Sequence, residues 1–212
     1  MIVYLASNNA HKCEEIRDLL RVAEVDIDLR SAQDLGEMPP VEESEDSFEG
    51  NARLKATALA AHLADDAFWA LADDSGLEVE ALDGAPGVHS ARFAGTHGDD
   101  AANNNRLLDE LEGVAPDKRN ARFRCVLVLR NRLGDEEVYE GTCEGSIAER
   151  MAGEHGFGYD PLFIPEGQHH TFAELGPEVK AQLSHRARAI AAWIAATGSA
   201  PPLRGWPHTR PR

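Results

Sequence analysis

The chain has 212 residues, of which 42% are hydrophobic, and its 37 Asp and Glu residues against 21 Lys and Arg give a formal net charge of −16. The hydrophobic content supports a folded core and excludes a disordered protein, and no apolar run approaches the roughly 18 residues of a membrane span. The negative charge repels nucleic acid over most of the surface, so an anionic ligand requires locally gathered cations or a divalent metal.

The first half of the chain alternates strand and helix patterns. In order, the expected elements are a strand at 2–6, a polar turn at 7–9, a helix at 10–21, a strand at 25–30, an acidic loop at 36–47 and a helix that begins near Asp46. Glu49 lies three residues after Asp46, as in a capping box. The N-terminus has no signal-peptide pattern, and three scattered cysteines fit a reducing, cytoplasmic location.

Two adjacent carboxylates, Asp73 and Asp74, follow the apolar residues 69–72, which predict a short buried strand. Ser75-Gly76 then predicts a turn, so both carboxylates are expected where the strand leaves the core. Their side chains point to opposite faces if the extended backbone continues through both. Such a pair of carboxylates can bind a metal or simply cap the turn. Without other evidence, the pair indicates a turn cap more than a metal site.

The second half of the chain predicts more strands and fewer helices. The expected elements are an alternating stretch at 77–82, a loop at 83–95, a helix at 99–112, antiparallel strands at 121–131 and 136–151, a glycine-rich loop at 153–163 and one final helix at 178–197. The element order predicts an α/β fold with a mixed central β-sheet flanked by helices. We expect residues 1–198 to form a single domain and residues 199–212 to be a proline-rich tail.

Polar loops follow several of the expected strands, and ligands of open α/β sheets gather beyond strand ends. The turn at 7–9 opens a helix, where free N–H groups and the helix dipole attract anions. The same residues also fit an ordinary helix cap with a solvated Lys12. The turn lacks the glycines of a P-loop, so a Walker-type NTPase is not expected.

The acidic pairs at 42–43 and 73–74 offer the hard oxygen ligands that Mg²⁺ prefers. Taken singly, each feature has an ordinary explanation: a solvated acidic loop, a snorkelling Lys55, or surface charge at residues 185–186. Together, carboxylates, separated lysines and Phe157 in a glycine-rich loop predict a nucleoside triphosphate site.

The sequence also resembles the family of inosine and xanthosine triphosphate pyrophosphatases. The matching stretches, in the family's order, are "SNNAHKCEEI", "VEESEDSFEGNARLKA", "LADDSGLEVEALDGAPGVHSARFAG", "FGYDPLF" and "KAQLSHRARA". The resemblance implies hydrolysis of ITP, dITP and XTP to the monophosphate and pyrophosphate, which keeps these bases out of DNA and RNA. It also implies Mg²⁺, a homodimer, and two lobes around a deep substrate cleft.

The resemblance assigns roles residue by residue. Asp74 matches the proton acceptor and metal ligand, and the second metal ligand is Glu42 or Glu43. The implied substrate contacts are Ser7, Asn8, Asn9, Ala10, His11, Lys12, Lys55, Ser75, Phe157, Gly158, Tyr159, Asp160, Lys180, His185 and Arg186. Gly50 departs from the family, in which many members carry Glu, and this concerns the first turn of the helix more than the chemistry.

Base selection is expected to combine stacking on Phe157 with donors from His185, Arg186 or loop backbone that pair with the 6-oxo group and leave adenine unmatched. The expected partner is a small nucleotide, and neither nucleic acid nor a membrane is expected. Two alternatives stay open: a pyrophosphatase for another modified nucleotide, such as a pyrimidine triphosphate, and a nucleotide-binding regulator without turnover.

Overall fold

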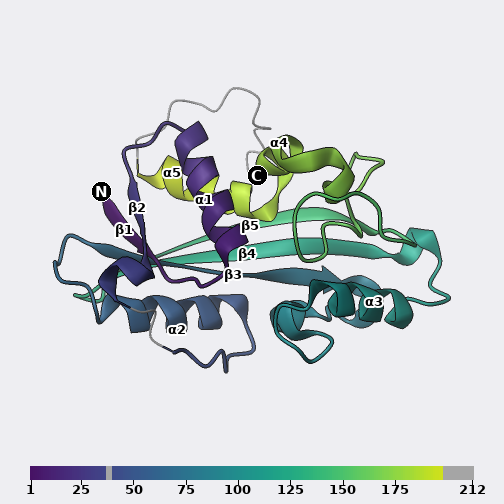
Figure 1. Cartoon of the computed structure of the whole chain (residues 1–212), viewed down its shortest axis with the longest axis horizontal. Coiled ribbons are helices and arrows are strands. Elements are labelled where there is room, and N and C mark those ends of the chain that lie inside the picture. The colour runs from purple at the N-terminus through teal and green to yellow at the C-terminus, as the bar shows by residue number, and fades with distance from the viewer. Residues whose placement is uncertain (37–39, 198–212) are drawn as a thin grey trace, which may run out of the picture.

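Residues 1–36 and 40–197, which the computed structural model describes, form one six-stranded sheet in the order β2-β1-β3-β4-β5-β6 (Figure 1). The proline-rich tail at 199–212 and residues 37–39 of the acidic loop lie outside the described residues. The strands are β1 (Ile2–Leu5), β2 (Asp28–Ser31), β3 (Trp69–Val79), β4 (Asn120–Asn131), β5 (Glu136–Ile147) and β6 (Phe163–Pro165). β1 pairs in parallel with β2 and β3, and the other pairs are antiparallel, so the predicted mixed sheet is confirmed.

Helices cover both faces of this sheet (Figure 1). One face carries α1 (Ala10–Val22), α4 (Phe172–Leu183) and α5 (His185–Ala196), and the other carries α2 (Phe48–Ala60) and α3 (Asp100–Glu110). Short 3-10 helices connect them: η1 (Ala32–Leu35), η2 (Glu80–Leu82), η3 (Gly87–Arg92) and η4 (Pro116–Lys118). Trp193 and Ile16 fill the core on the first face, and Phe48 and Leu59 fill it on the second. Among the described residues, no helix has both the length and the apolar character needed to cross a membrane.

The prediction of a turn at Ser75-Gly76 is wrong, because β3 continues through it. β3 pairs with β4 along its whole length, from Trp69 opposite Asn131 to Val79 opposite Ala121. Gly76 serves close packing: a Cβ at this position would lie 2.4 Å from the Ser90 Oγ and 2.5 Å from the Gly87 carbonyl oxygen. Long-range pairing therefore overrides the local turn preference, and residues 73–74 lie in the middle of a strand with side chains on opposite faces.

The single final helix predicted for 178–197 is also wrong, since two helices occupy this region. α4 begins earlier than predicted, at Phe172, and a non-helical Gly176 (φ 80°) followed by Pro177 kinks it. Ser184 is extended, ends α4, and caps α5 by accepting a hydrogen bond from Ala187 N at 3.2 Å. This restart places His185 and Arg186 in the first turn of α5.

The remaining boundaries differ by a few residues. α2 begins at Phe48 with Ser47 as its N-cap, which accepts a hydrogen bond from Gly50 N at 3.1 Å. The capping box between Asp46 and Glu49 is therefore wrong, and Glu49 instead pairs with Arg53 at 2.6 Å. The second strand lies at 28–31 instead of 25–30, the fifth ends at 147 instead of 151, and the loop at 83–95 contains η3.

Candidate active site

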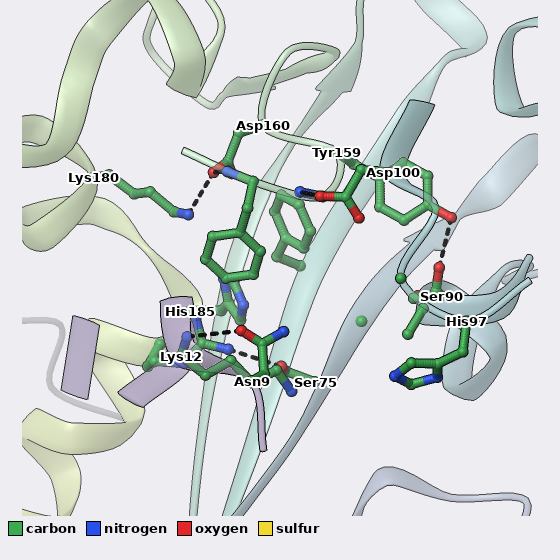
Figure 2. A pocket seen from close by; sticks show the side chains of 17 residues that line it. Asn9, Lys12, Ser75, Ser90, His97, Asp100, Tyr159, Asp160, Lys180 and His185 are labelled. Carbon is green, nitrogen blue, oxygen red and sulfur yellow. Dashed lines mark hydrogen bonds and ion pairs between the residues drawn. The ribbon is translucent and has the colours of Figure 1, made fainter. Parts of the chain in front are cut away.

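A pocket opens beside the middle of β3, between α1, η3 and the segment that precedes α4 (Figure 2). Its empty space is about 670 Å³, a figure that includes open solvent at its mouth. The predicted contacts that line it are Asn9, Lys12, Ser75, Phe157, Gly158, Tyr159, Asp160, Lys180, His185 and Arg186.

Asp73 is an ion-paired anchor under this pocket. Its side chain is fully buried, and the carboxylate lies 2.6 Å from Lys12 Nζ and 2.8 Å from Arg186 Nε. The Ser75 hydroxyl donates to it at 2.9 Å. Burial alone raises the pKa of such a carboxyl, but Arg186 and Lys12 outweigh burial and hold the pKa of Asp73 well below its usual range. Asp73 is therefore a fixed anion that holds two cations in place.

Asp74 has different surroundings on the opposite face of β3. Its Oδ1 lies 2.6 Å from Lys55 Nζ, which also donates to the Asp73 backbone oxygen at 3.0 Å. Burial raises the pKa of Asp74 above its usual value, although Lys55 opposes this effect. A carboxylate with a raised pKa is a better proton acceptor than one whose pKa is held low, so Asp74 is better suited to accept a proton than Asp73.

Of the two glutamates predicted as metal ligands, Glu43 lies on the same side as Asp74, because both carboxylates contact Lys55. Glu43 Oε1 lies 3.2 Å from Lys55 Nζ, and Lys55 outweighs burial and lowers the pKa of Glu43. Glu42 is exposed and lines a separate surface hollow with Arg53. The sequence does not distinguish these neighbours, because their orientation depends on how the loop packs against α2.

The carboxylates of Glu43 and Asp74 suit a cation, because a lysine ammonium already lies within 3.2 Å of one and 2.6 Å of the other. Within residues 1–36 and 40–197, no group of three or more His, Cys, Asp or Glu side chains is arranged to hold a metal ion. Mg²⁺ commonly binds one or two carboxylates and completes its shell with waters and substrate phosphates. The pair therefore fits Mg²⁺ that arrives with a nucleotide.

A second group of charges surrounds Phe157 on the other side of the pocket. Lys180 Nζ lies 2.5 Å from Asp160 and 2.6 Å from Glu15, and Arg186 lies 2.5 Å from the other Glu15 oxygen. Lys180 Nζ also lies 4.4 Å from the centre of the Phe157 ring. Glu15 is not among the predicted contacts. The sequence indicates it only through its position three residues after Lys12, on the same face of α1.

His185 and Arg186 are not surface charges, since their relative exposures are 4% and 1%. The His185 ring stacks on Phe123 with centroids 4.7 Å apart, and burial lowers its pKa well below the usual value, so the imidazole is neutral. Its Nδ1 has no hydrogen-bond partner among the described residues. Arg186 is occupied by Asp73, Glu15 and Ser75.

The loop that carries Phe157 is held through its backbone. Gly158 N donates to Asp100 Oδ2 at 2.7 Å, and Asn104 Nδ2 donates to the Gly158 oxygen at 2.7 Å. The Tyr159 hydroxyl donates to the Ser90 carbonyl oxygen at 2.9 Å (Figure 2). These α3 and η3 partners were missed, because bonds to backbone atoms leave no motif in the sequence.

The turn before α1 forms as predicted. Asn9 Oδ1 caps the helix by accepting from Lys12 N at 3.1 Å, and Ser7 Oγ accepts from Asn9 N at 3.1 Å. Asn8, Ala10 and His11 are exposed. The His11 ring lies across from the Phe157 ring, with centroids 5.2 Å apart.

Comparisons with known proteins agree with this fold. A model of the Ham1 family matches residues 3–196. The dITP/XTP pyrophosphatase of Opitutus terrae is 45% identical over 195 residues, covering 90% of this chain and 96% of the relative, and that of Rhodopirellula baltica is 48% identical, covering 90% and 89%. A HAM1 protein structure from Coxiella burnetii superposes with a TM-score of 0.83 at 36% identity, covering 94% of this chain and 100% of that chain. The chain therefore belongs to the Ham1 family, in agreement with the resemblance of its motifs.

Proposed function

We propose that this chain is a nucleoside triphosphate pyrophosphatase that hydrolyses ITP, dITP and XTP to the monophosphate and pyrophosphate. The relatives named dITP/XTP pyrophosphatase, at 45% and 48% identity, support this activity. The observation that carries the proposal is the contrast between two adjacent carboxylates. Asp73 anchors cations under the pocket, whereas Asp74 has a raised pKa beside Lys55 and Glu43. By removing these nucleotides, the enzyme keeps their bases out of DNA and RNA.

Asp74 is the residue that orients the attacking water and accepts its proton. Its raised pKa and its place beside Lys55 suit a base that works near neutral pH. When bound to Glu43 and Asp74, Mg²⁺ supplies charge neutralisation at the phosphate oxygens. Lys12, which lines the pocket, and Lys55, which lies beside Asp74 and Glu43, offset the remaining charge of the triphosphate.

The group around Phe157 selects the base. The Phe157 ring offers a stacking surface, which suits every base equally. The neutral His185 lines the same pocket, and a ring N–H of this imidazole would donate to the 6-oxo group of hypoxanthine or xanthine. Adenine presents an amino donor at that position and leaves the donors of a buried site unmatched, which is a strong basis for rejection.

Release of pyrophosphate from a panel of triphosphates tests the proposal. The panel contains ITP, dITP, XTP, GTP, ATP and modified pyrimidine triphosphates, each with Mg²⁺. We expect kcat/KM for ITP, dITP and XTP to exceed that for ATP by at least about 100-fold, a lower bound compared with the roughly 10⁴-fold that a hydrogen-bonding site can reach. Preference for a modified pyrimidine would indicate a different substrate, and binding without turnover would indicate a regulator.

We also propose a cytoplasmic homodimer. Cys13, Cys125 and Cys143 are all free thiols, which supports a reducing location. Light scattering coupled to gel filtration measures the oligomeric state directly, and a mass of one chain would contradict the dimer.

A further inference from the structure

Arg92 lies at the edge of the candidate metal site and is absent from the predicted contacts. It is the last residue of η3, and its Nη1 lies 3.5 Å from Glu43 Oε2. Lys55 Nζ lies 3.2 Å from the other oxygen, Glu43 Oε1. One carboxylate therefore separates two cations that come from different elements, α2 and η3.

The guanidinium of Arg92 is held more loosely than the other cations of the site. Lys12, Lys55, Lys180 and Arg186 each lie within 2.8 Å of a carboxylate oxygen. The contact of Arg92 is longer than a hydrogen bond, and its side chain is 33% exposed. An arginine has five N–H donors in a planar fork that matches phosphate oxygens, so Arg92 retains donors for a ligand.

The backbone that carries Arg92 is fixed on both sides. Before it, Ser90 Oγ accepts from Leu77 N at 2.9 Å, which ties η3 to β3 just beyond Asp74. After it, Asn103 Oδ1 accepts from Ala94 N at 2.7 Å. The side chain can therefore exchange partners while its Cα stays in place.

We propose that Arg92 binds the phosphates that become the pyrophosphate product. This inference rests on the proposed function, in which Glu43 is a ligand of Mg²⁺. In the free protein Glu43 serves as the counter-ion of Arg92, and a metal–nucleotide complex neutralises Glu43 and offers phosphate oxygens to the guanidinium. The role is positioning and charge stabilisation at the end of the nucleotide remote from the base.

Calorimetric binding of two product fragments tests the role of Arg92. Inorganic pyrophosphate carries the phosphates that Arg92 should contact, and IMP does not. With Mg²⁺ present, Arg92→Gln should weaken pyrophosphate binding at least about tenfold, the scale of a charge-assisted contact, and leave IMP binding unchanged. Arg92→Lys should give a smaller loss, because the charge remains and the fork is lost.

The control is Arg132→Gln. Arg132 is an exposed residue in the turn between β4 and β5, and its side chain pairs with Asp66 at 2.9 Å. It should bind both ligands as the unaltered protein does. Unchanged pyrophosphate binding in Arg92→Gln, or equal losses for pyrophosphate and IMP, would overturn the proposal. If Arg92→Gln does not fold, the same comparison in Arg92→Lys decides. Hydrolysis of ITP by the unaltered protein is measured separately, so failure of the proposed function is distinguishable from failure of the Arg92 assignment.

Discussion

Replacing Asp73 with Asn is expected to cost stability more than any other single change in the site. Asp73 is the carboxylate that Lys12 and Arg186 share, at 2.6 and 2.8 Å, and its side chain is fully buried. Asn keeps one acceptor oxygen and the same shape, but its amide presents N–H donors to cations. The substitution therefore leaves Arg186, itself buried, with Glu15 as its only remaining carboxylate within ion-pair distance among the described residues.

The magnitude follows from this partial loss. Removing one partner of a buried ion pair usually costs about 3–5 kcal/mol, because the other charge stays buried without compensation. Two features favour the lower end: Glu15 still neutralises Arg186, and Lys12 is partly exposed and can turn to solvent. We expect Asp73→Asn to lower the free energy of unfolding by about 3 kcal/mol. The matched control, Asp66→Asn in an exposed pair with Arg132, should change it by less than about 1 kcal/mol.

The pH dependence gives a second, independent readout. The pKa of Asp73 in the folded protein lies well below its usual value, whereas in the unfolded chain it is about 3.9. Its stabilisation is thus complete above the unfolded pKa and is lost as pH falls through the folded pKa. Urea unfolding followed by circular dichroism measures the free energy of unfolding of the unaltered protein and of Asp73→Asn. The difference between the two values should be constant from about pH 8 to 5 and should decrease below about pH 4. The reasoning would be refuted if Asp73→Asn lowered the free energy of unfolding by less than about 1 kcal/mol, or if the difference between the two proteins increased in acid.

Three further predictions concern activity. Asp74→Asn should lower kcat for ITP at least about 100-fold, as expected for loss of a general base, and near-normal turnover would exclude Asp74 from that role. Activity should vanish with a chelator and return with Mg²⁺ but poorly with Ca²⁺, which holds a looser geometry; full activity in EDTA would contradict the metal assignment. Phe157→Ala should raise KM alike for ITP, XTP, GTP and ATP, whereas His185→Ala should reduce the ratio of kcat/KM between ITP and ATP. An unchanged ratio would show that His185 does not read the base.

Elements with a strong local pattern could be predicted from the sequence. α1 and β4 lie within a residue of their predicted bounds, because each buries an apolar face of clear periodicity. The continuation of β3 through Ser75-Gly76 could not be predicted, since its cause is pairing with a strand about 50 residues later. The break between α4 and α5 did leave a signal, the N-cap Ser184, and Gly176-Pro177 marks the kink inside α4.

Some residues of the site could likewise be predicted from the sequence, and others could not. The motifs supply residues that are chemically distinctive in sequence, such as Lys12, Asp74 and Phe157. Glu15 could not be recognised, because its partners Lys180 and Arg186 follow it by more than 160 residues and only the fold brings them together. The choice of Glu43 over Glu42 likewise depends on the position of Lys55 on α2.

The free site is a network in which every cation already has a carboxylate partner, from Lys180 with Asp160 to Lys55 with Asp74. The overall charge of −16 repels a polyanion from most of the surface, so attraction of an anion depends on the cations of this site. A free triphosphate would have to compete with those carboxylates for the same cations. Under the proposed function, a magnesium–nucleotide complex would bring positive charge to Glu43 and Asp74, and Lys55 would then be free to contact the phosphates. Under the proposed function, this arrangement therefore favours the metal complex over the bare nucleotide as the species that binds.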